Sequence, residues 1–227
     1  MNELKIENLS CKRGENIVLN NINFSIKSGE TLVVKGRNGS GKTTLLRILS
    51  NFITSYEGKV LFNDVGISDD NLYNSKFNLI GQKNSLKENL SIKKNLELWD
   101  ILFNEALNHA KLLEHNNLHH LINKDVSSLS DGQKKCISLH RLNYNKCDMW
   151  FLDEPFVFLD EVNTNLLIEK INQFNENMGT VILTSNINLP KKFHKEINIY
   201  QKNESLAQSS LFGMSLSSSI WAKKRNF

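Results

Sequence analysis

Residues 36–44 read Gly-Arg-Asn-Gly-Ser-Gly-Lys-Thr-Thr, and they match the phosphate-binding loop pattern G-x-x-x-x-G-K-[ST] at every fixed position. The glycines can take backbone angles closed to other residues, which lets the chain approach a phosphate closely. Successive backbone N–H groups then point into one concavity, and the helix that should begin near Gly41 adds the positive end of its dipole. The stretch therefore predicts a nucleotide phosphate site between a strand and a helix.

The residues around this loop supply the expected context. Thr31–Lys35 is a short apolar run, as a buried parallel strand should be, and the apolar residues of 45–49 follow with helical spacing. This context argues against a chance match to a glycine-rich turn. Lys42 should reach the β- and γ-phosphates of ATP, and the Thr43 hydroxyl should ligate Mg²⁺. The predicted nucleotide-binding residues are Gly36, Arg37, Asn38, Gly39, Ser40, Gly41, Lys42, Thr43 and Thr44.

Short apolar strands alternate with helical patterns along the rest of the chain. We predict strands at 3–9, 60–62, 77–80, 149–152 and 181–183, and a turn at 56–59. Helical patterns lie between residue 83 and about 145, and an amphipathic helix follows the fourth strand. This alternation predicts an α/β fold with a parallel-sheet core, preceded by an antiparallel β layer.

The amino-acid composition limits which class of protein this chain can belong to. The 227 residues are 40% hydrophobic and 23% charged, which is ordinary for a globular protein. The net charge is +4 and the lysines are scattered, so a solvated surface is favoured over nucleic-acid binding. Without a bilayer-length apolar run or a signal-peptide core, we expect a soluble chain that reaches a membrane only through a partner. Cys11, Cys136 and Cys147 lack metal-ligand spacing and are predicted to be reduced thiols.

Two acids end the apolar run Met149–Leu152, as in a Walker B motif. Asp153 is suited to bind Mg²⁺ directly or through water, and Glu154 would be the base that polarises the attacking water. An acidic loop after a buried strand is the alternative, but the upstream phosphate loop favours the functional interpretation.

The segment Leu129-Ser-Asp-Gly-Gln133 precedes a predicted helix, whose N-terminus would let Ser130 and the Gly132 N–H bind a phosphate. Alone it would be an ordinary helix cap. Its place between the phosphate loop and the Walker B strand resembles the ATP-binding cassette (ABC) ATPases over roughly residues 1–200. The resemblance implies an ABC cassette with a small helical subdomain. It also implies a head-to-tail homodimer in which Ser130, Gly132 and Gln133 complete the ATP site of the opposite subunit.

The same resemblance assigns two further residues. Gln82, after the strand at 77–80, matches the glutamine that senses Mg²⁺ and water and links the ATP site to a transmembrane partner. Asp160 matches an aspartate that contacts the opposite subunit, although the preceding residues 156–159 are bulkier than is usual in the family.

Two positions depart from the family pattern. A switch histidine usually follows the strand after Walker B, but here Asn186 follows Thr184 and Ser185. An asparagine can hydrogen-bond a γ-phosphate but cannot titrate, which puts the hydrolysis rate in doubt. The aromatic residue that stacks on adenine is also missing; Cys11, Lys12 or Arg13 lies there, and an arginine could stack on the base instead.

Within the superfamily, the chain resembles the ATP-binding subunits of the haem exporter of cytochrome c maturation. The residues that carry this resemblance include Cys11, Trp150 before Phe-Leu-Asp-Glu-Pro-Phe, and the compact helical region. It implies an ATPase on the cytoplasmic face of a bacterial inner membrane or the matrix face of a mitochondrial one. Transmembrane subunits and haem-handling proteins would be its partners. ATP hydrolysis would power haem export or release of haem from its chaperone.

Three alternatives remain open at this point. The chain could serve another small transporter, or be a cassette protein of translation or DNA repair, although those usually carry paired cassettes or long coiled-coil insertions. Asn186 motivates a third alternative, a degenerate cassette with little turnover. We expect an ABC domain at 1–200, with its helical subdomain at about 83–145. A flexible extension is expected at 201–227, where a membrane-surface or partner-binding segment is the alternative.

Overall fold

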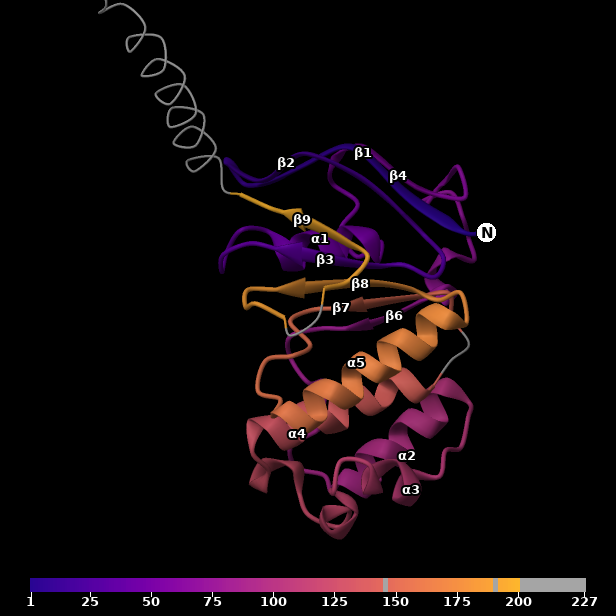
Figure 1. The fold of residues 1–227 in the computed structure, drawn as a ribbon, viewed down its shortest axis with the longest axis vertical. Coiled ribbons are helices and arrows are strands. Elements are labelled where there is room, and N and C mark those ends of the chain that lie inside the picture. The colour runs from indigo at the N-terminus through magenta and orange to yellow at the C-terminus, as the bar shows by residue number, and fades with distance from the viewer. Residues whose placement is uncertain (145–146, 190–191, 201–227) are drawn as a thin grey trace, which may run out of the picture.

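The computed structural model describes residues 1–144, 147–189 and 192–200 (Figure 1). The strands are β1 Glu3–Arg13, β2 Asn16–Lys27, β3 Thr31–Lys35, β4 Glu57–Phe62, β5 Val65–Gly66, β6 Phe77–Ile80, β7 Met149–Leu152, β8 Thr180–Ser185 and β9 Lys195–Asn198. The α-helices are α1 Lys42–Leu49, α2 Ile92–Phe103, α3 His109–Glu114, α4 Asp131–Leu139 and α5 Glu161–Glu176. Short 3₁₀ helices are η1 Tyr73–Ser75, η2 His119–Leu121, η3 Val126–Ser128 and η4 His140–Asn143.

An antiparallel sheet in the order β2-β1-β4-β5 forms one layer of the molecule, as the sequence predicts (Figure 1). The register of β1 with β4 shifts between Glu7 and Ser10, where Asn8 has a φ of 51°. Gly58 of β4 lies against this bulge, and a Cβ there would come within 2.5 Å of the Asn8 carbonyl oxygen. The predicted turn at 56–59 is therefore wrong, because Gly58 serves a close approach between two strands.

A parallel sheet in the order β6-β7-β8-β3-β9 forms the second layer. Successive side chains of β3 point to opposite faces: Leu32 and Val34 pack with α1, whereas Val33 packs with α5. Helix α1 thus lies between the two sheets, and α5 covers the other face of the parallel sheet (Figure 1). The short edge strand β9 was not predicted, because its four residues include a single apolar side chain, Ile197.

The helical region, residues 91–144, builds a third apolar cluster around Leu96, Trp99 and Ile137. Helix α2 begins after Ser91, whose hydroxyl accepts a hydrogen bond from the Lys94 N–H at 3.3 Å. The elements α2, α3 and α4 lie at the end of the molecule remote from the antiparallel sheet (Figure 1). The sequence predicts this helical region, although it does not separate the individual helices.

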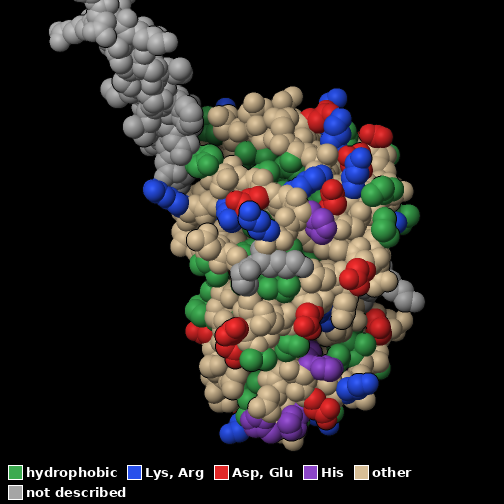
Figure 2. Space-filling model, in the orientation of Figure 1, with side chains coloured by type: hydrophobic (Ala, Val, Ile, Leu, Met, Phe, Trp, Pro, Cys, Tyr) green, Lys and Arg blue, Asp and Glu red, His purple; other side chains and the backbone are tan. Residues whose placement is uncertain are grey.

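Positive and negative side chains are interspersed over the face shown in Figure 2. Within the described residues, none of the helices is both long and apolar enough to cross a bilayer. All three cysteines are free and buried, in agreement with the prediction of reduced thiols. The predicted extension at 201–227 lies outside the described residues.

Candidate nucleotide site

The phosphate loop connects β3 to α1, as the sequence predicts. Gly39 and Gly41 have φ angles of 82° and 102°, in the region that favours glycine. Gly36 is needed for a different reason: a Cβ there would lie 2.4 Å from the Ser40 hydroxyl oxygen and 2.7 Å from the Ile199 carbonyl oxygen. The Ser40 hydroxyl is buried without a hydrogen-bond partner among the described residues. A buried hydroxyl without a partner is consistent with a loop whose polar atoms bind a ligand.

Lys42 begins α1, and its side chain folds back over the loop. Its ammonium donates hydrogen bonds to the carbonyl oxygens of Gly36, at 2.8 Å, and Arg37, at 3.1 Å. It also lies 3.4 Å from Glu154 Oε1. With 5% of its side chain exposed, Lys42 is a buried cation held at the loop by carbonyl groups and one carboxylate.

The Walker B acids are fixed by two threonines. The Thr43 hydroxyl donates to Asp153 Oδ2 at 2.7 Å, and the Thr184 hydroxyl donates to Asp153 Oδ1, also at 2.7 Å. The same Thr184 oxygen accepts the backbone N–H of Glu154 at 2.8 Å. Strands β7 and β8 bring these groups together because Leu152 is in register with Leu183. Both oxygens of Asp153 are thereby held by hydrogen bonds from the two threonine hydroxyls.

Gln82 completes the contacts of Glu154. Its side-chain amide donates to Glu154 Oε2 at 3.0 Å, and the Glu154 backbone has a φ of 46°. Such a left-handed conformation is uncommon outside glycine, and observed cases cluster at functional sites. Thr43, Gln82 and Asp153 all line one groove of about 630 Å³. Three oxygen donors in one groove are the ligand type that Mg²⁺ prefers, so the residues fit that ion.

Asn186 follows β8 and lies beside the phosphate loop. Its amide donates to the side-chain oxygen of Asn38 at 3.0 Å, and the residue is exposed. The structure thus brings the residue at the expected histidine position to the loop. Thr44, in the first turn of α1, is buried.

The predicted trans contacts lie on two other helix N-termini. Ser130 caps α4: its hydroxyl accepts the Gln133 N–H at 3.3 Å, while the Gln133 side chain accepts the Ser130 N–H at 3.0 Å. Asp160 caps α5 in the same way, by accepting the Asn163 N–H at 2.8 Å. A Cβ on Gly132 would lie 2.6 Å from the Phe158 carbonyl oxygen, so these two N-termini are packed together. Helix α4 lies beyond the parallel sheet from α1 (Figure 1).

Sequence reasoning missed two residues of this site. The first is Thr184, which contacts both acids and which the sequence indicates only as a residue that follows the apolar run 181–183. Lys135 of α4 is 3% exposed, and burial lowers its pKa while the charges of Asp153 and Glu154 act in the opposite direction. The one feature of the sequence that could have indicated Thr184 is a polar residue at the end of an apolar strand. No feature of the sequence indicates Lys135, because its burial depends on tertiary packing.

Comparison with known proteins agrees with this geometry. Residues 19–157 match the family model of the ABC transporters. The chain belongs to the ABC transporter family. It is 32% identical over 204 residues to the cytochrome c biogenesis ATP-binding export protein CcmA of Histophilus somni, covering 88% of this chain and 94% of that protein. A CcmA of Reclinomonas americana is 33% identical over 199 residues, which cover 83% of this chain and 89% of the relative.

Solved structures share the fold. A putative ABC transporter ATP-binding protein from Pyrococcus furiosus aligns with a TM-score of 0.73 at 23% identity, covering 88% of this chain and 100% of its own. An ATP-binding cassette in a dimeric, post-hydrolysis state bound to ADP and phosphate aligns with a TM-score of 0.72 at 24% identity, covering 86% and 94% of the two chains. The predicted fold class, a parallel-sheet core with an antiparallel layer and helices, is confirmed.

Proposed function

We propose that the chain binds ATP and hydrolyses it as the ATP-binding subunit of an ABC transporter. The observation that carries this proposal is a group of side-chain contacts at one place. Lys42 and Gln82 both contact Glu154, and Thr43 contacts the adjacent Asp153. These residues supply a cation for the phosphates, three side chains with oxygen donors for a metal, and a carboxylate that can act as general base. Loop residues 36–41 bind the phosphates through backbone N–H groups, and Lys42 exchanges its carbonyl partners for phosphate oxygens.

Thr43, Gln82 and Asp153 would hold Mg²⁺, which when bound neutralises charge on the phosphate oxygens. Glu154 accepts the proton of the attacking water through the carboxylate that Gln82 contacts at 3.0 Å. Thr184 keeps that carboxylate in place through the Glu154 backbone N–H. Asn186 donates a hydrogen bond to the γ-phosphate from its position beside Asn38.

We propose further that two copies assemble head to tail. Ser130, Gly132 and Gln133 of one copy would contact the nucleotide of the other, and Asp160 would line the same interface. The capping of α4 supports this role, because Gln133 and Ser130 hold the first turn in a fixed geometry with its N-terminus exposed. The similarity to a dimeric cassette structure also supports it.

The membrane partner would dock in the groove beside Gln82. That groove carries aromatic and basic side chains, among them Phe103, Arg47 and Arg141, and the neighbouring Phe52 is 71% exposed. A groove with both apolar and cationic walls suits a helical segment of a transmembrane subunit. Because Gln82 lines the groove and contacts Glu154, docking there would be transmitted to the catalytic carboxylate.

The similarity to CcmA proteins supports haem export, or release of haem from its chaperone, in cytochrome c biogenesis. Haem-handling proteins would then be partners. The chain would lie on the cytoplasmic face of a bacterial inner membrane or the matrix face of a mitochondrial one. Residues 1–200 would form the cassette domain, with a helical subdomain at about 83–145, followed by an extension at 201–227.

A second candidate is a cassette that binds ATP with little turnover. Asn186 favours it, because an amide beside Asn38 supplies a hydrogen bond but no titrating group.

The substitution Glu154→Gln separates the two candidates. For a hydrolase, this variant of the full chain, assembled with its membrane partners, should lose about 100-fold or more of its ATP turnover, as expected for loss of a general base. Its ATP affinity should be retained, since Gln keeps the side-chain size. Glu161→Gln at the exposed start of α5 is the matched control and should leave turnover unchanged. Absence of turnover in the intact wild-type assembly would favour the second candidate.

A further inference from the structure

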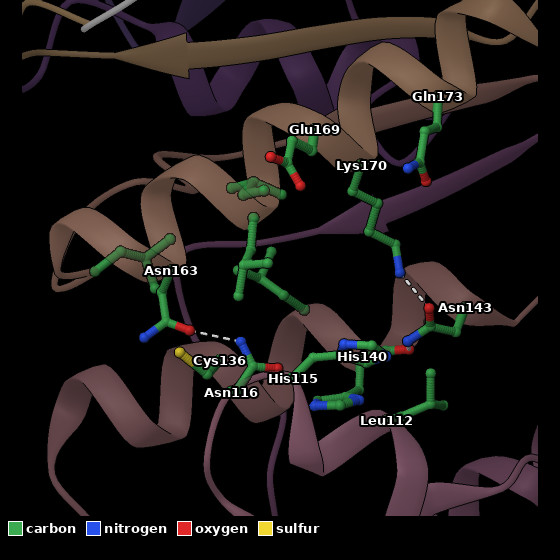
Figure 3. Close-up of a pocket in the computed structure, with 14 residues that line it drawn as sticks. Leu112, His115, Asn116, Cys136, His140, Asn143, Asn163, Glu169, Lys170 and Gln173 are labelled. Carbon is green, nitrogen blue, oxygen red and sulfur yellow. Dashed lines mark hydrogen bonds between the residues drawn. The ribbon is translucent and has the colours of Figure 1, made fainter.

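A cavity of about 320 Å³ lies apart from the nucleotide site, between α5, the end of α3, and the α4–η4 segment (Figure 3). Its walls combine leucine side chains, including Leu112 and Leu167, with imidazole, amide and ammonium groups. Neither the proposed catalytic steps nor the proposed dimer contacts use these polar groups. The cavity therefore needs an explanation of its own.

His140 forms part of the cavity wall and is 5% exposed. Neither of its ring nitrogens has a hydrogen-bond partner among the described residues. Burial lowers the pKa of His140 to about 3, and the positive charge of Lys170 adds to this effect, so the ring is neutral at physiological pH. A buried imidazole without partners costs free energy, and a hydrogen-bond acceptor placed against its N–H would remove part of that cost.

Lys170 extends from α5 into the same cavity, where its ammonium donates to the side-chain oxygen of Asn143 (Figure 3). No carboxylate of the described residues forms an ion pair with it. Burial lowers the pKa of Lys170 to about 8, so the amine is still largely protonated at neutral pH. At the other end of the cavity, the Asn116 amide donates to the Asn163 side-chain oxygen at 2.5 Å (Figure 3).

We propose that this cavity is a binding site for a small organic anion. Its anionic head group lies between Lys170 and His140, and its carbon chain lies along the leucine side chains. The head group supplies the counter-charge that Lys170 lacks and accepts the N–H of His140. The apolar walls exclude larger polar solutes and favour a short aliphatic body.

The other titratable side chains that line the cavity are more exposed than Lys170. His115 and Glu169 also line it, but both side chains are exposed at its rim, where solvent screens the charge of the Glu169 carboxylate. Lys170 is therefore the partly buried charge that a ligand meets. A cation would be repelled by it, and a neutral ligand would leave it without a counter-charge.

Hexanoate is a suitable probe because it joins a carboxylate to a short aliphatic chain. Acetate tests the carboxylate without the chain, and 1-hexanol tests the chain without the negative charge. In the full chain, labelled at histidine ring nitrogens and lysine side-chain carbons, hexanoate should shift the His140 and Lys170 resonances saturably. Acetate and 1-hexanol should bind more weakly. Lys170→Met keeps the aliphatic stem but should weaken hexanoate binding about tenfold, the loss expected for one charge-assisted hydrogen bond.

Lys111→Met on the exposed part of α3 is the matched control and should bind hexanoate like the wild type. His140→Leu should also weaken hexanoate binding, by less than Lys170→Met does, while leaving the fold at least as stable, because it removes an unsatisfied polar ring. The proposal would be overturned by non-saturable shifts, by equal binding of hexanoate to Lys170→Met, or by 1-hexanol binding as tightly as hexanoate.

Discussion

Helices α1 and α4 both present an N-terminus suited to phosphate, yet their first turns differ. At α1 the cap is Gly41, which offers no side-chain hydrogen bond, and the following Lys42 is buried against carbonyl groups and Glu154. At α4 the capping residues Ser130 and Gln133 satisfy each other, and Ser130 is exposed. The polar groups in the first turn of α1 thus contact other parts of the chain, whereas Ser130 and Gln133 at the start of α4 contact each other.

This difference suits an ATP site that is divided between two copies of the chain. In the proposed function, the phosphate-loop region holds the residues for phosphate, metal and water, so it should bind ATP in a single copy. In the proposed head-to-tail pair, the α4 segment would contribute an anion-binding turn to the second copy. Substitutions in the first region should therefore affect a monomer, and substitutions in the second should affect assembly.

The largest effect is expected for Lys42→Ala. This change removes a buried ammonium and should weaken ATP binding by the monomer about 100-fold, as for loss of a strong charge-assisted contact. Equilibrium binding of a fluorescent ATP analogue measures it. Lys35→Ala, which removes a partly exposed lysine paired with Glu196, is the control and should change affinity little. Unchanged affinity in Lys42→Ala would show that the loop is not the phosphate site.

Ser130→Arg tests whether the N-terminus of α4 takes part in dimerisation. A bulky cation at the α4 cap should weaken ATP-driven dimerisation about 30-fold, a typical loss for a residue at the centre of an interface. ATP binding by the monomer should be retained. Sedimentation in the presence of ATP and the Glu154→Gln background reports the dimer. Ser127→Arg, on the nearby exposed η3, should dimerise normally; if both variants dimerise alike, the trans contact is wrong.

Thr184→Val tests whether Thr184 positions the two acids beside the phosphate loop. The change keeps side-chain shape but removes the hydrogen bond to Asp153 Oδ1 and the acceptor of the Glu154 N–H, while Thr43 still donates to Asp153 Oδ2. We expect turnover to fall about tenfold with ATP affinity nearly unchanged. Thr180→Val in the same strand is the control, because the Thr180 hydroxyl donates to the distant Lys27 carbonyl. Equal turnover in the two variants would remove Thr184 from the positioning role.

The smallest effect concerns Asp100 of α2, which contacts Tyr144 and His109 in the helical region. Burial alone would raise the pKa of Asp100, but hydrogen bonds from Tyr144, at 2.6 Å, and His109, at 2.7 Å, outweigh it and hold the pKa below its usual value. This stabilisation is present above the unfolded-state pKa, near 4, and is lost as the pH falls through the folded-state pKa.

Asp100→Asn should therefore lower the free energy of unfolding at neutral pH by about 1 kcal/mol, with a smaller difference from wild type in acid. Urea unfolding at several pH values measures it. Asp125→Asn at an exposed position is the control. A deficit of Asp100→Asn that does not shrink in acid would contradict this role of the carboxylate.

Local motifs made much of the fold and the phosphate loop predictable. The loop, β3 and β6 have the expected bounds because each depends on glycine geometry or a short apolar run. The role of Thr184 was not predictable from one sequence, since it needs the register of β7 with β8. The β1 bulge likewise turned a predicted turn into strand at Gly58. The cavity at His140 arises from three helices meeting, which no local pattern indicates.

The central claim is that each ATP site takes its phosphate loop from one copy and its α4 turn from another. The most direct test mixes full-length Lys42→Ala and Ser130→Arg chains, each inactive alone, within the complete assembly, and measures ATP turnover. In a mixed pair, one site joins the intact loop of the Ser130→Arg copy with the intact turn of the Lys42→Ala copy. We predict that the mixture recovers turnover. Continued inactivity of the mixture, with mixed pairs shown to form, would contradict the account.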